Sequence, residues 1–137
     1  MADTDNVSTP GCQGPRELLV DDDESLRRAL VRSIRLAGFD VEGYDSVEAL
    51  LAAGVPERAA LLVLDVNLPG IGGIALKRAL VEAGRDLPTI FITALDPEDV
   101  RKPLAALAPV AVLYKPLRTD DLLKAIGGTG MVPRSGP

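Results

Sequence analysis

Short apolar runs alternate along this chain with longer stretches whose apolar residues recur at helical spacing. The clearest run is Leu61-Leu62-Val63-Leu64, which is apolar without interruption, as in a strand that is covered on both faces. Other stretches, such as 24–37, place apolar residues three and four positions apart. This alternation is typical of an α/β fold, in which helices cover both faces of a parallel sheet.

The pattern predicts five pairs of a strand and a helix. The strands are expected at 18–21, 40–44, 60–65, 89–93 and 111–114. The helices are expected at 24–37, at 47–53, at 74–83, from Asp96-Pro97 onward, and at 119–126. Pro103 falls inside the fourth helix, where a proline removes a backbone donor and clashes with the preceding turn, so we expect a kink or an early end there.

Glycine and proline gather at both ends of a chain whose 137 residues fit one domain. We therefore expect a flexible N-terminal tail at 1–16, one folded domain at 17–126, and a flexible C-terminal tail or linker start at 127–137. No DNA-binding segment is expected after Ile126. Whether the chain stands alone or is part of a longer protein stays open.

The composition of the chain excludes several kinds of functional site. The chain has no histidine, which excludes histidine metal ligands and nucleophiles that use a histidine base. The net charge is −5 and the basic residues are scattered in sequence, so direct nucleic-acid binding is not expected. No apolar stretch is long enough to span a bilayer, and the single cysteine, Cys12, has no partner in the chain. We expect a cytoplasmic protein without membrane attachment.

Reactive side chains follow four of the predicted strands at their carboxyl ends. They are Asp21 and Asp22 after the first strand, Asp65 at the end of the third, Thr93 at the end of the fourth, and Lys115 after the fifth. In an open parallel sheet these ends lie along one edge, where ligands bind. We therefore expect one crevice to hold three carboxylates, a hydroxyl and an ammonium group.

Each of these residues also has a purely structural explanation. The acidic run at 21–24 could form a turn and a helix cap, and Asp65 could favour the turn before Pro69-Gly70. Thr93 could be an ordinary strand residue, and Lys115 a solvated lysine. Taken together these explanations require four coincidences at one sheet edge, so a functional site is favoured.

The electrostatics of such a crevice require a cation. Two carboxylates about 4 Å apart repel by about 4 kcal/mol at an effective dielectric constant of about 20. With oxygen ligands only, Mg²⁺ is the suitable ion. A carboxylate beside Mg²⁺ and a lysine can attack phosphorus, and the product would be an aspartyl phosphate.

Four segments resemble the receiver domain of bacterial two-component response regulators, including the chemotaxis regulators. In chain order they are Leu-Leu-Val-Asp-Asp-Asp (18–23), Leu-Asp-Val-Asn-Leu-Pro-Gly (64–70), Ile-Thr-Ala (92–94) and Tyr-Lys-Pro-Leu (114–117). The resemblance covers about 17–126. It implies a flavodoxin-like, doubly wound sheet of five parallel strands in the order 2-1-3-4-5 with five helices, and a cis peptide at Lys115-Pro116.

The resemblance also implies roles for the site residues. Asp65 would accept the phosphoryl group, Thr93 would move its hydroxyl toward it, Ala94 would leave room for it, and Lys115 would pair with it. The implied Mg²⁺ ligands are Asp22, Asp65 and the backbone carbonyl of Asn67, with Asp21 acting through water.

As a receiver, the chain would accept its phosphoryl group from a sensor histidine kinase, a phosphotransfer protein or a small phosphodonor. It would pass the signal to a downstream effector protein, and a phosphorylation-dependent dimer is one form that this output could take. The only catalysis expected is Mg²⁺-dependent self-phosphorylation and autodephosphorylation at Asp65.

The sequence departs from the receiver pattern near the expected output surface. Val112 stands where receivers commonly carry an aromatic residue, Ala108-Pro109 replaces a Gly-Ala pair, and Pro103 interrupts the fourth helix. We expect phosphorylation at Asp65, with the signal passed on by reshaping of the fourth helix and its flanking loops.

The sequence leaves three alternative functions. A degenerate receiver that acts only as a binding module is the first alternative. A small Mg²⁺-dependent phosphohydrolase of the haloacid dehalogenase type is less favoured, because Asn67 stands where that family uses an aspartate. Flavin binding is disfavoured, because the chain lacks a Ser/Thr-rich phosphate loop.

Overall fold

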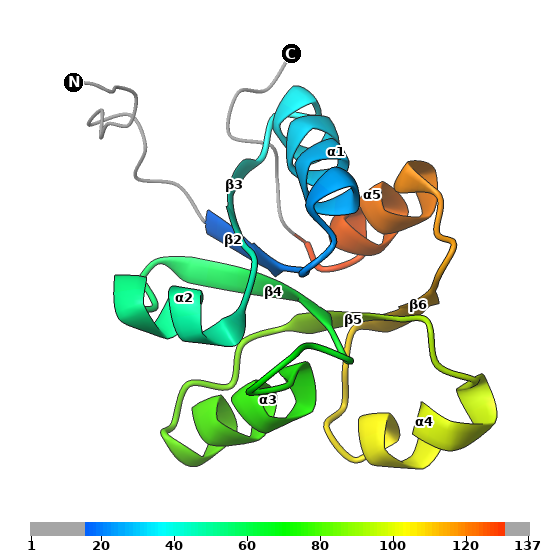
Figure 1. The fold of residues 1–137 in the computed structure, drawn as a ribbon. Coiled ribbons are helices and arrows are strands. Elements are labelled where there is room, and N and C mark those ends of the chain that lie inside the picture. The colour runs from blue at the N-terminus through cyan, green and yellow to red at the C-terminus, as the bar shows by residue number, and fades with distance from the viewer. Residues whose placement is uncertain (1–15, 131–137) are drawn as a thin grey trace.

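Five parallel strands form the centre of the molecule, as the computed structural model shows for residues 16–130 (Figure 1). The strands are β2 (Arg16–Val20), β3 (Asp40–Tyr44), β4 (Ala59–Asp65), β5 (Thr89–Thr93) and β6 (Ala111–Tyr114). Their order in the sheet is β3-β2-β4-β5-β6, with every neighbouring pair parallel. In chain order this is 2-1-3-4-5, so the predicted topology is confirmed.

Five helices cover the two faces of the sheet (Figure 1). They are α1 (Glu24–Leu36), α2 (Val47–Ala53), α3 (Gly73–Glu82), α4 (Pro97–Ala105) and α5 (Thr119–Gly127). The helices α1 and α5 pack on one face, and α2, α3 and α4 pack on the other. Each connection between consecutive strands passes through a helix, as parallel pairing requires.

Strand β4 shows why its sequence is apolar without interruption. Leu62 and Leu64 point into the core under α2, α3 and α4, whereas Leu61 and Val63 point into the core under α1 and α5. All four side chains are fully buried. Because both faces of this central strand are covered, no position between Leu61 and Leu64 favours a polar residue.

Local signals begin and end the helices as expected. The side chains of Asp23, Ser46 and Asp96 accept hydrogen bonds from backbone N–H groups at the starts of α1, α2 and α4. Gly38 and Gly84 follow α1 and α3 with φ of 97° and 80°, a left-handed conformation that glycine adopts without strain.

The region around α4 carries two of the departures noted in the sequence. Helix α4 runs through Pro103 and ends at Ala105, within the same turn, which agrees with the expected early end. The next residues form tighter bonds, with the Ala108 N–H donating to the Ala105 carbonyl at 3.1 Å. Ala108 has a φ of 49°, a left-handed conformation that a residue with a Cβ adopts at a cost.

The described elements begin with β2 and end with α5. Arg16 begins β2 and forms ion pairs with Asp40 and Glu42 at 3.3 and 3.5 Å, and Gly127 ends α5. Most of the two predicted tails, together with Cys12, lies outside the described residues. Within residues 16–130, every helix is too short or too polar to cross a bilayer.

Glu17 is a carboxylate buried inside the sheet. It pairs in register with Val41 and Leu61, which belong to the core under α1 and α5. Its side chain is fully buried, and neither carboxylate oxygen has a hydrogen-bond partner among the described residues. Burial raises its pKa from an ordinary value of 4.5 to about 8, so the neutral acid is the stable form at neutral pH.

We predict that Glu17 makes the fold less stable as pH rises. The folded chain keeps a proton that the unfolded chain releases above pH 4.5, so the free energy of unfolding falls between pH 4.5 and about 8. At about 1.4 kcal/mol per pKa unit, the loss amounts to a few kcal/mol. Urea unfolding at both ends of this range should show a smaller loss for Glu17→Gln, and parallel losses would contradict the prediction.

We also predict that Ala108→Gly stabilises the fold by up to about 1 kcal/mol, because glycine removes the cost of the positive φ. The matched control is Ala106→Gly, two residues earlier, where φ is −65°. There glycine only adds backbone entropy to the unfolded chain, and a loss of about 0.5–1 kcal/mol is expected. Opposite signs in urea unfolding would support the assignment, and destabilisation by both changes would refute it.

Candidate functional site

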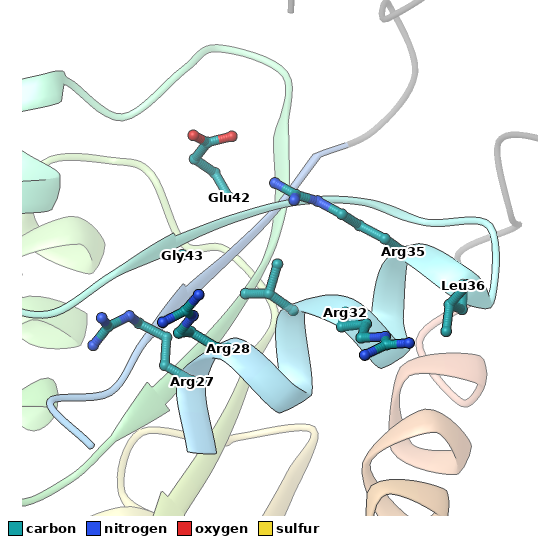
Figure 2. Close-up of a pocket in the computed structure, with 8 residues that line it drawn as sticks. Arg27, Arg28, Arg32, Arg35, Leu36, Glu42 and Gly43 are labelled. Carbon is teal, nitrogen blue, oxygen red and sulfur yellow. The ribbon is translucent and has the colours of Figure 1, made fainter. Parts of the chain in front are cut away.

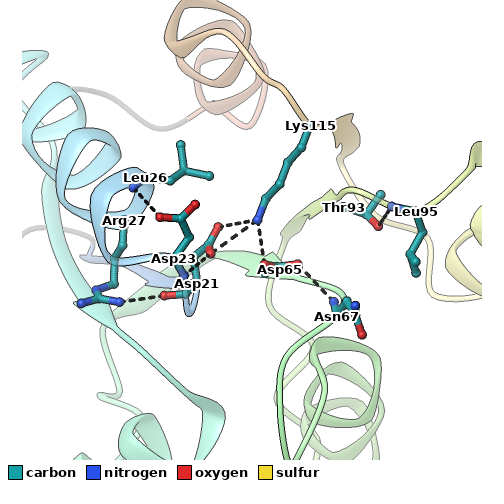
Figure 3. A network of polar contacts seen from close by, with 9 residues as sticks. All are labelled: Asp21, Asp23, Leu26, Arg27, Asp65, Asn67, Thr93, Leu95 and Lys115. Carbon is teal, nitrogen blue, oxygen red and sulfur yellow. Dashed lines mark hydrogen bonds and ion pairs between the residues drawn. The ribbon is translucent and has the colours of Figure 1, made fainter.

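The sheet register places two aspartates side by side. Val20 of β2 pairs with Leu64 of β4, so the residues that follow them, Asp21 and Asp65, lie next to each other at the carboxyl edge (Figure 3). Asp21 is fully buried and Asp65 is 4% exposed. The edge where the sequence predicted a ligand site therefore holds two carboxylates that are almost completely removed from water.

Asp22 adds a third carboxylate to this pair. Single oxygens of Asp21, Asp22 and Asp65 all lie within 4.8 Å of one another, and Asp22 is exposed. Three carboxylates at this spacing repel strongly in a partly dehydrated site. The donor set consists of oxygens only and fits a hard divalent cation such as Mg²⁺.

Lys115, which follows β6, supplies the nearest positive charge. Its Nζ atom lies 2.9 Å from Oδ2 of Asp65 and 3.2 Å from Oδ2 of Asp21 (Figure 3). Its backbone N–H donates to the Thr93 carbonyl at 2.8 Å, which anchors the residue to the end of β5. Burial alone would lower the pKa of Lys115, but the hydrogen bond to Asp65 and the charge of Asp21 raise it. Lys115 is therefore an ammonium group at neutral pH.

One lysine does not neutralise the site. Burial raises the pKa of Asp21 above its ordinary value, and the negative charge of Asp65 raises it further. The hydrogen bond from the Asp23 N–H and the charge of Lys115 act in the opposite direction but do not outweigh burial. This excess of negative charge favours the binding of a cation.

Backbone N–H groups orient both buried carboxylates. The Asp23 N–H donates to Oδ1 of Asp21 at 2.9 Å, and the Asn67 N–H donates to Oδ1 of Asp65 at 3.1 Å. The Asp23 side chain also caps α1 by accepting from Leu26 N at 3.1 Å. Within the acidic run, Asp23 therefore caps the helix, whereas Asp21 belongs to the carboxylate cluster.

Thr93 ends β5 and is fully buried. Its Oγ1 accepts a hydrogen bond from the Leu95 N–H at 2.9 Å (Figure 3). Among the described residues its hydroxyl makes no hydrogen bond to Asp65 or Lys115. The structure thus places Thr93 at the predicted edge with its hydroxyl engaged in the turn that leads to α4.

A cavity of about 460 Å³ opens beside Lys115. Ala94, Pro116 and Leu117 line it together with Asp23 and Leu26. The Lys115-Pro116 peptide is cis, as the resemblance implied.

Two residues that support the position of Asp65, Gly73 and Glu48, were not identified from the sequence. A Cβ at Gly73 would lie 2.5 Å from the Asp65 carbonyl oxygen, so only glycine lets α3 begin this close to β4. Glu48 of α2 accepts a hydrogen bond from the Ile71 N–H at 3.0 Å and so supports the loop after Asp65. The glycines on both sides of Ile71 are a sequence signal of close backbone packing. Glu48 has no such signal, because it lies 23 positions before Ile71 in the chain.

Val112 and Tyr114 lie on the same side of β6. Val112 pairs with Phe91 and packs against the core under α2, α3 and α4. Tyr114 pairs with Thr93 and is 38% exposed. The aromatic side chain in this region thus stands beside the threonine, at the end of the strand.

Comparisons with known proteins agree with this geometry. Residues 18–127 match the family model of the response regulator receiver domain. The chain is 36% identical over 110 residues to "Nodulation protein W" of Bradyrhizobium diazoefficiens and 40% identical over 113 residues to "Response regulator MprA" of Mycobacterium avium. Each match covers 79% of this chain, but only 48% and 47% of these relatives, so the chain spans about half of their length.

A solved structure shows the same relationship. The response regulator StyR is 37% identical, with a TM-score of 0.74 over 83% of this chain and 58% of that one. The family match spans the sheet, the acidic edge and all five helices. This chain belongs to the family of response regulator receiver domains.

Proposed function

We propose that this receiver domain is switched by phosphorylation of Asp65. The observation that carries the proposal is the contact between Oδ2 of Asp65 and Nζ of Lys115 at 2.9 Å, in a site shared with Asp21 and Asp22. A carboxylate held in this way is oriented and electrostatically stabilised. Carboxylate oxygens of this kind can act as nucleophiles toward phosphorus.

The proposed reaction is a phosphoryl transfer. A carboxylate oxygen of Asp65 forms a bond to phosphorus while the bond between phosphorus and the donor breaks, and the donor leaves with the electron pair. The transferred group carries its charge on its three equatorial oxygens. Lys115 is placed to neutralise part of this charge, and the Asn67 N–H keeps the other carboxylate oxygen in position.

A magnesium ion fits the remaining negative charge of the site. The residues that would hold it are Asp21, Asp22 and Asp65, whose carboxylates lie close together, and, from the likeness to receiver domains, the backbone carbonyl of Asn67. When bound, Mg²⁺ supplies positive charge that draws electron density from the phosphoryl oxygens. Asp21 is fully buried, and the Asp23 N–H orients its carboxylate.

Thr93 connects this chemistry to the output surface in our proposal. Its side chain would turn toward the phosphoryl group and donate its O–H to a phosphoryl oxygen, and this movement would take Oγ1 away from the Leu95 N–H and release the turn between β5 and α4. Helix α4 begins at Pro97, four residues after Thr93, and contains Pro103 near its end. A helix weakened by a proline in its last turn is easily reshaped.

The partners follow from this role. A sensor histidine kinase or a phosphotransfer protein would supply the phosphoryl group, and an effector protein or a phosphorylation-dependent dimer would read the result. The catalysis proposed for the chain itself is limited to self-phosphorylation and autodephosphorylation at Asp65. Of the alternatives, a binding module without phosphorylation is less consistent with the intact set of Asp21, Asp22, Asp65, Thr93 and Lys115.

We predict that the chain gains the mass of one phosphoryl group when incubated with Mg²⁺ and a small phosphodonor such as acetyl phosphate. Asp65→Asn should gain none, because an amide nitrogen is not a nucleophile toward phosphorus. Asp99→Asn, at an exposed position on α4, should behave like the wild type. Intact mass spectrometry measures all three. Labelling of Asp65→Asn would overturn the proposed site, and steady phosphomonoester turnover by that variant would favour a phosphohydrolase.

A second prediction concerns the signal. In NMR spectra, phosphorylation of the wild type should shift amide resonances in residues 95–112, because the Thr93 hydroxyl leaves Leu95. Thr93→Val should still be phosphorylated but should lose most of these shifts. The control is Thr89→Val at the other end of β5, where the hydroxyl bonds the Leu87 carbonyl at 2.9 Å. Shifts confined to the immediate site in the wild type would contradict the proposed route.

A further inference from the structure

A row of arginines lines a groove between α1 and the edge strand β3 (Figure 2). The groove has a volume of about 510 Å³, and we call it the arginine groove. Its lining includes Arg27, Arg28, Arg32 and Arg35 of α1, and Glu42 and Gly43 of β3. Asp21, Asp65 and Lys115 do not line it, and the groove adjoins the phosphorylation site only through the hydrogen bond from Arg27 to the Asp21 backbone carbonyl.

Most of the positive charge in the arginine groove is uncompensated. Arg27 donates to the Asp21 backbone carbonyl at 2.9 Å and Arg35 to the Val41 carbonyl at 3.1 Å, and both of these partners are neutral. Arg32 forms no ion pair with any residue in 16–130. These three guanidinium groups therefore lack an opposite charge, in a chain whose net charge is −5.

The two carboxylates near the groove do not change this balance. Glu24 pairs with Arg28 at 3.2 Å, but both side chains are more than two-thirds exposed, so the pair is weak and easily exchanged. Glu42, in the groove itself, pairs with Arg16 at 3.5 Å. An anionic partner would therefore meet guanidinium groups that are available for new contacts.

The arginines also have a regular spacing. Arg28, Arg32 and Arg35 follow one another at four and three positions, so they lie along one stripe of the helix over about 10 Å. Leu36, at the end of the same stripe, is 78% exposed and offers an apolar contact. Guanidinium groups bind carboxylates through two parallel hydrogen bonds, so this stripe is matched by carboxylates at a similar spacing.

We propose that the arginine groove binds an acidic peptide segment of a partner protein. A short peptide can place its carboxylates on the stripe and end within the groove. A nucleic acid would continue past the start of α1, where the exposed carboxylates of Asp22 and Asp23 would repel its phosphates. The acidic net charge of the chain adds to this repulsion.

Fluorescence anisotropy at low salt tests the proposal with the full, unphosphorylated chain and a labelled peptide of glutamate and glycine. The wild type should bind this peptide, and Arg32→Glu and Arg35→Glu should each weaken binding about tenfold. The control is Arg78→Glu on the exposed side of α3, which changes the net charge equally and should cost less than about twofold. Circular dichroism verifies that each variant is folded.

Three results would overturn the proposal. They are the absence of peptide binding by the wild type, an equal loss for Arg78→Glu, and tighter binding of a labelled DNA duplex with the same dependence on Arg32. The outcome is independent of the proposed phosphorylation, because Asp65→Asn should bind the peptide as the wild type does.

Discussion

Two buried aspartates from adjacent strands share one lysine, and the rest of the site is arranged around this contact. Without Lys115, Asp21 and Asp65 would face each other as like charges in a region almost closed to water. Such a pair is strongly unfavourable unless a cation accompanies it. The sheet order makes the contact possible, since it places β2 beside β4 and brings the end of β6 close enough for a lysine side chain to reach both.

A close backbone approach and a side-chain hydrogen bond maintain this arrangement. Gly73 lets the first turn of α3 rest against the Asp65 carbonyl, and Glu48 supports the Ile71 N–H on the following loop. The carboxylate of Asp65 is thus held on a rigid strand end and not on a free loop. Thr93 differs from these residues, because its hydroxyl accepts a single hydrogen bond from a turn, and this bond is lost when the side chain moves.

The fold could be predicted from the sequence because its signals are local. The apolar run at 61–64 indicated a strand covered on both sides, and caps such as Asp96 with Pro97 marked helix starts within a residue or two. The gathering of Asp21, Asp65 and Lys115 followed from the rule that parallel strands end at one edge. The distances between these three side chains could not be predicted in this way, because they depend on side-chain positions in three dimensions.

Other features could not be predicted, for identifiable reasons. Glu48 contacts a loop 23 residues away, and no local pattern links the two positions. The buried state of Glu17 was hidden because an acidic residue at the start of a strand ordinarily faces water. The basic residues looked scattered along the sequence, but the helical repeat of α1 places Arg28, Arg32 and Arg35 in one row.

Asp23 connects the position of the acidic edge to the start of α1. Its N–H fixes the Asp21 carboxylate and its side chain starts α1, so the segment between strand and helix has no freedom in length. An inserted or deleted residue there would displace the acidic edge and rotate the helix together. A change on α1 that leaves the acidic edge intact is therefore limited to an exchange of exposed side chains, with the helix itself kept in one place.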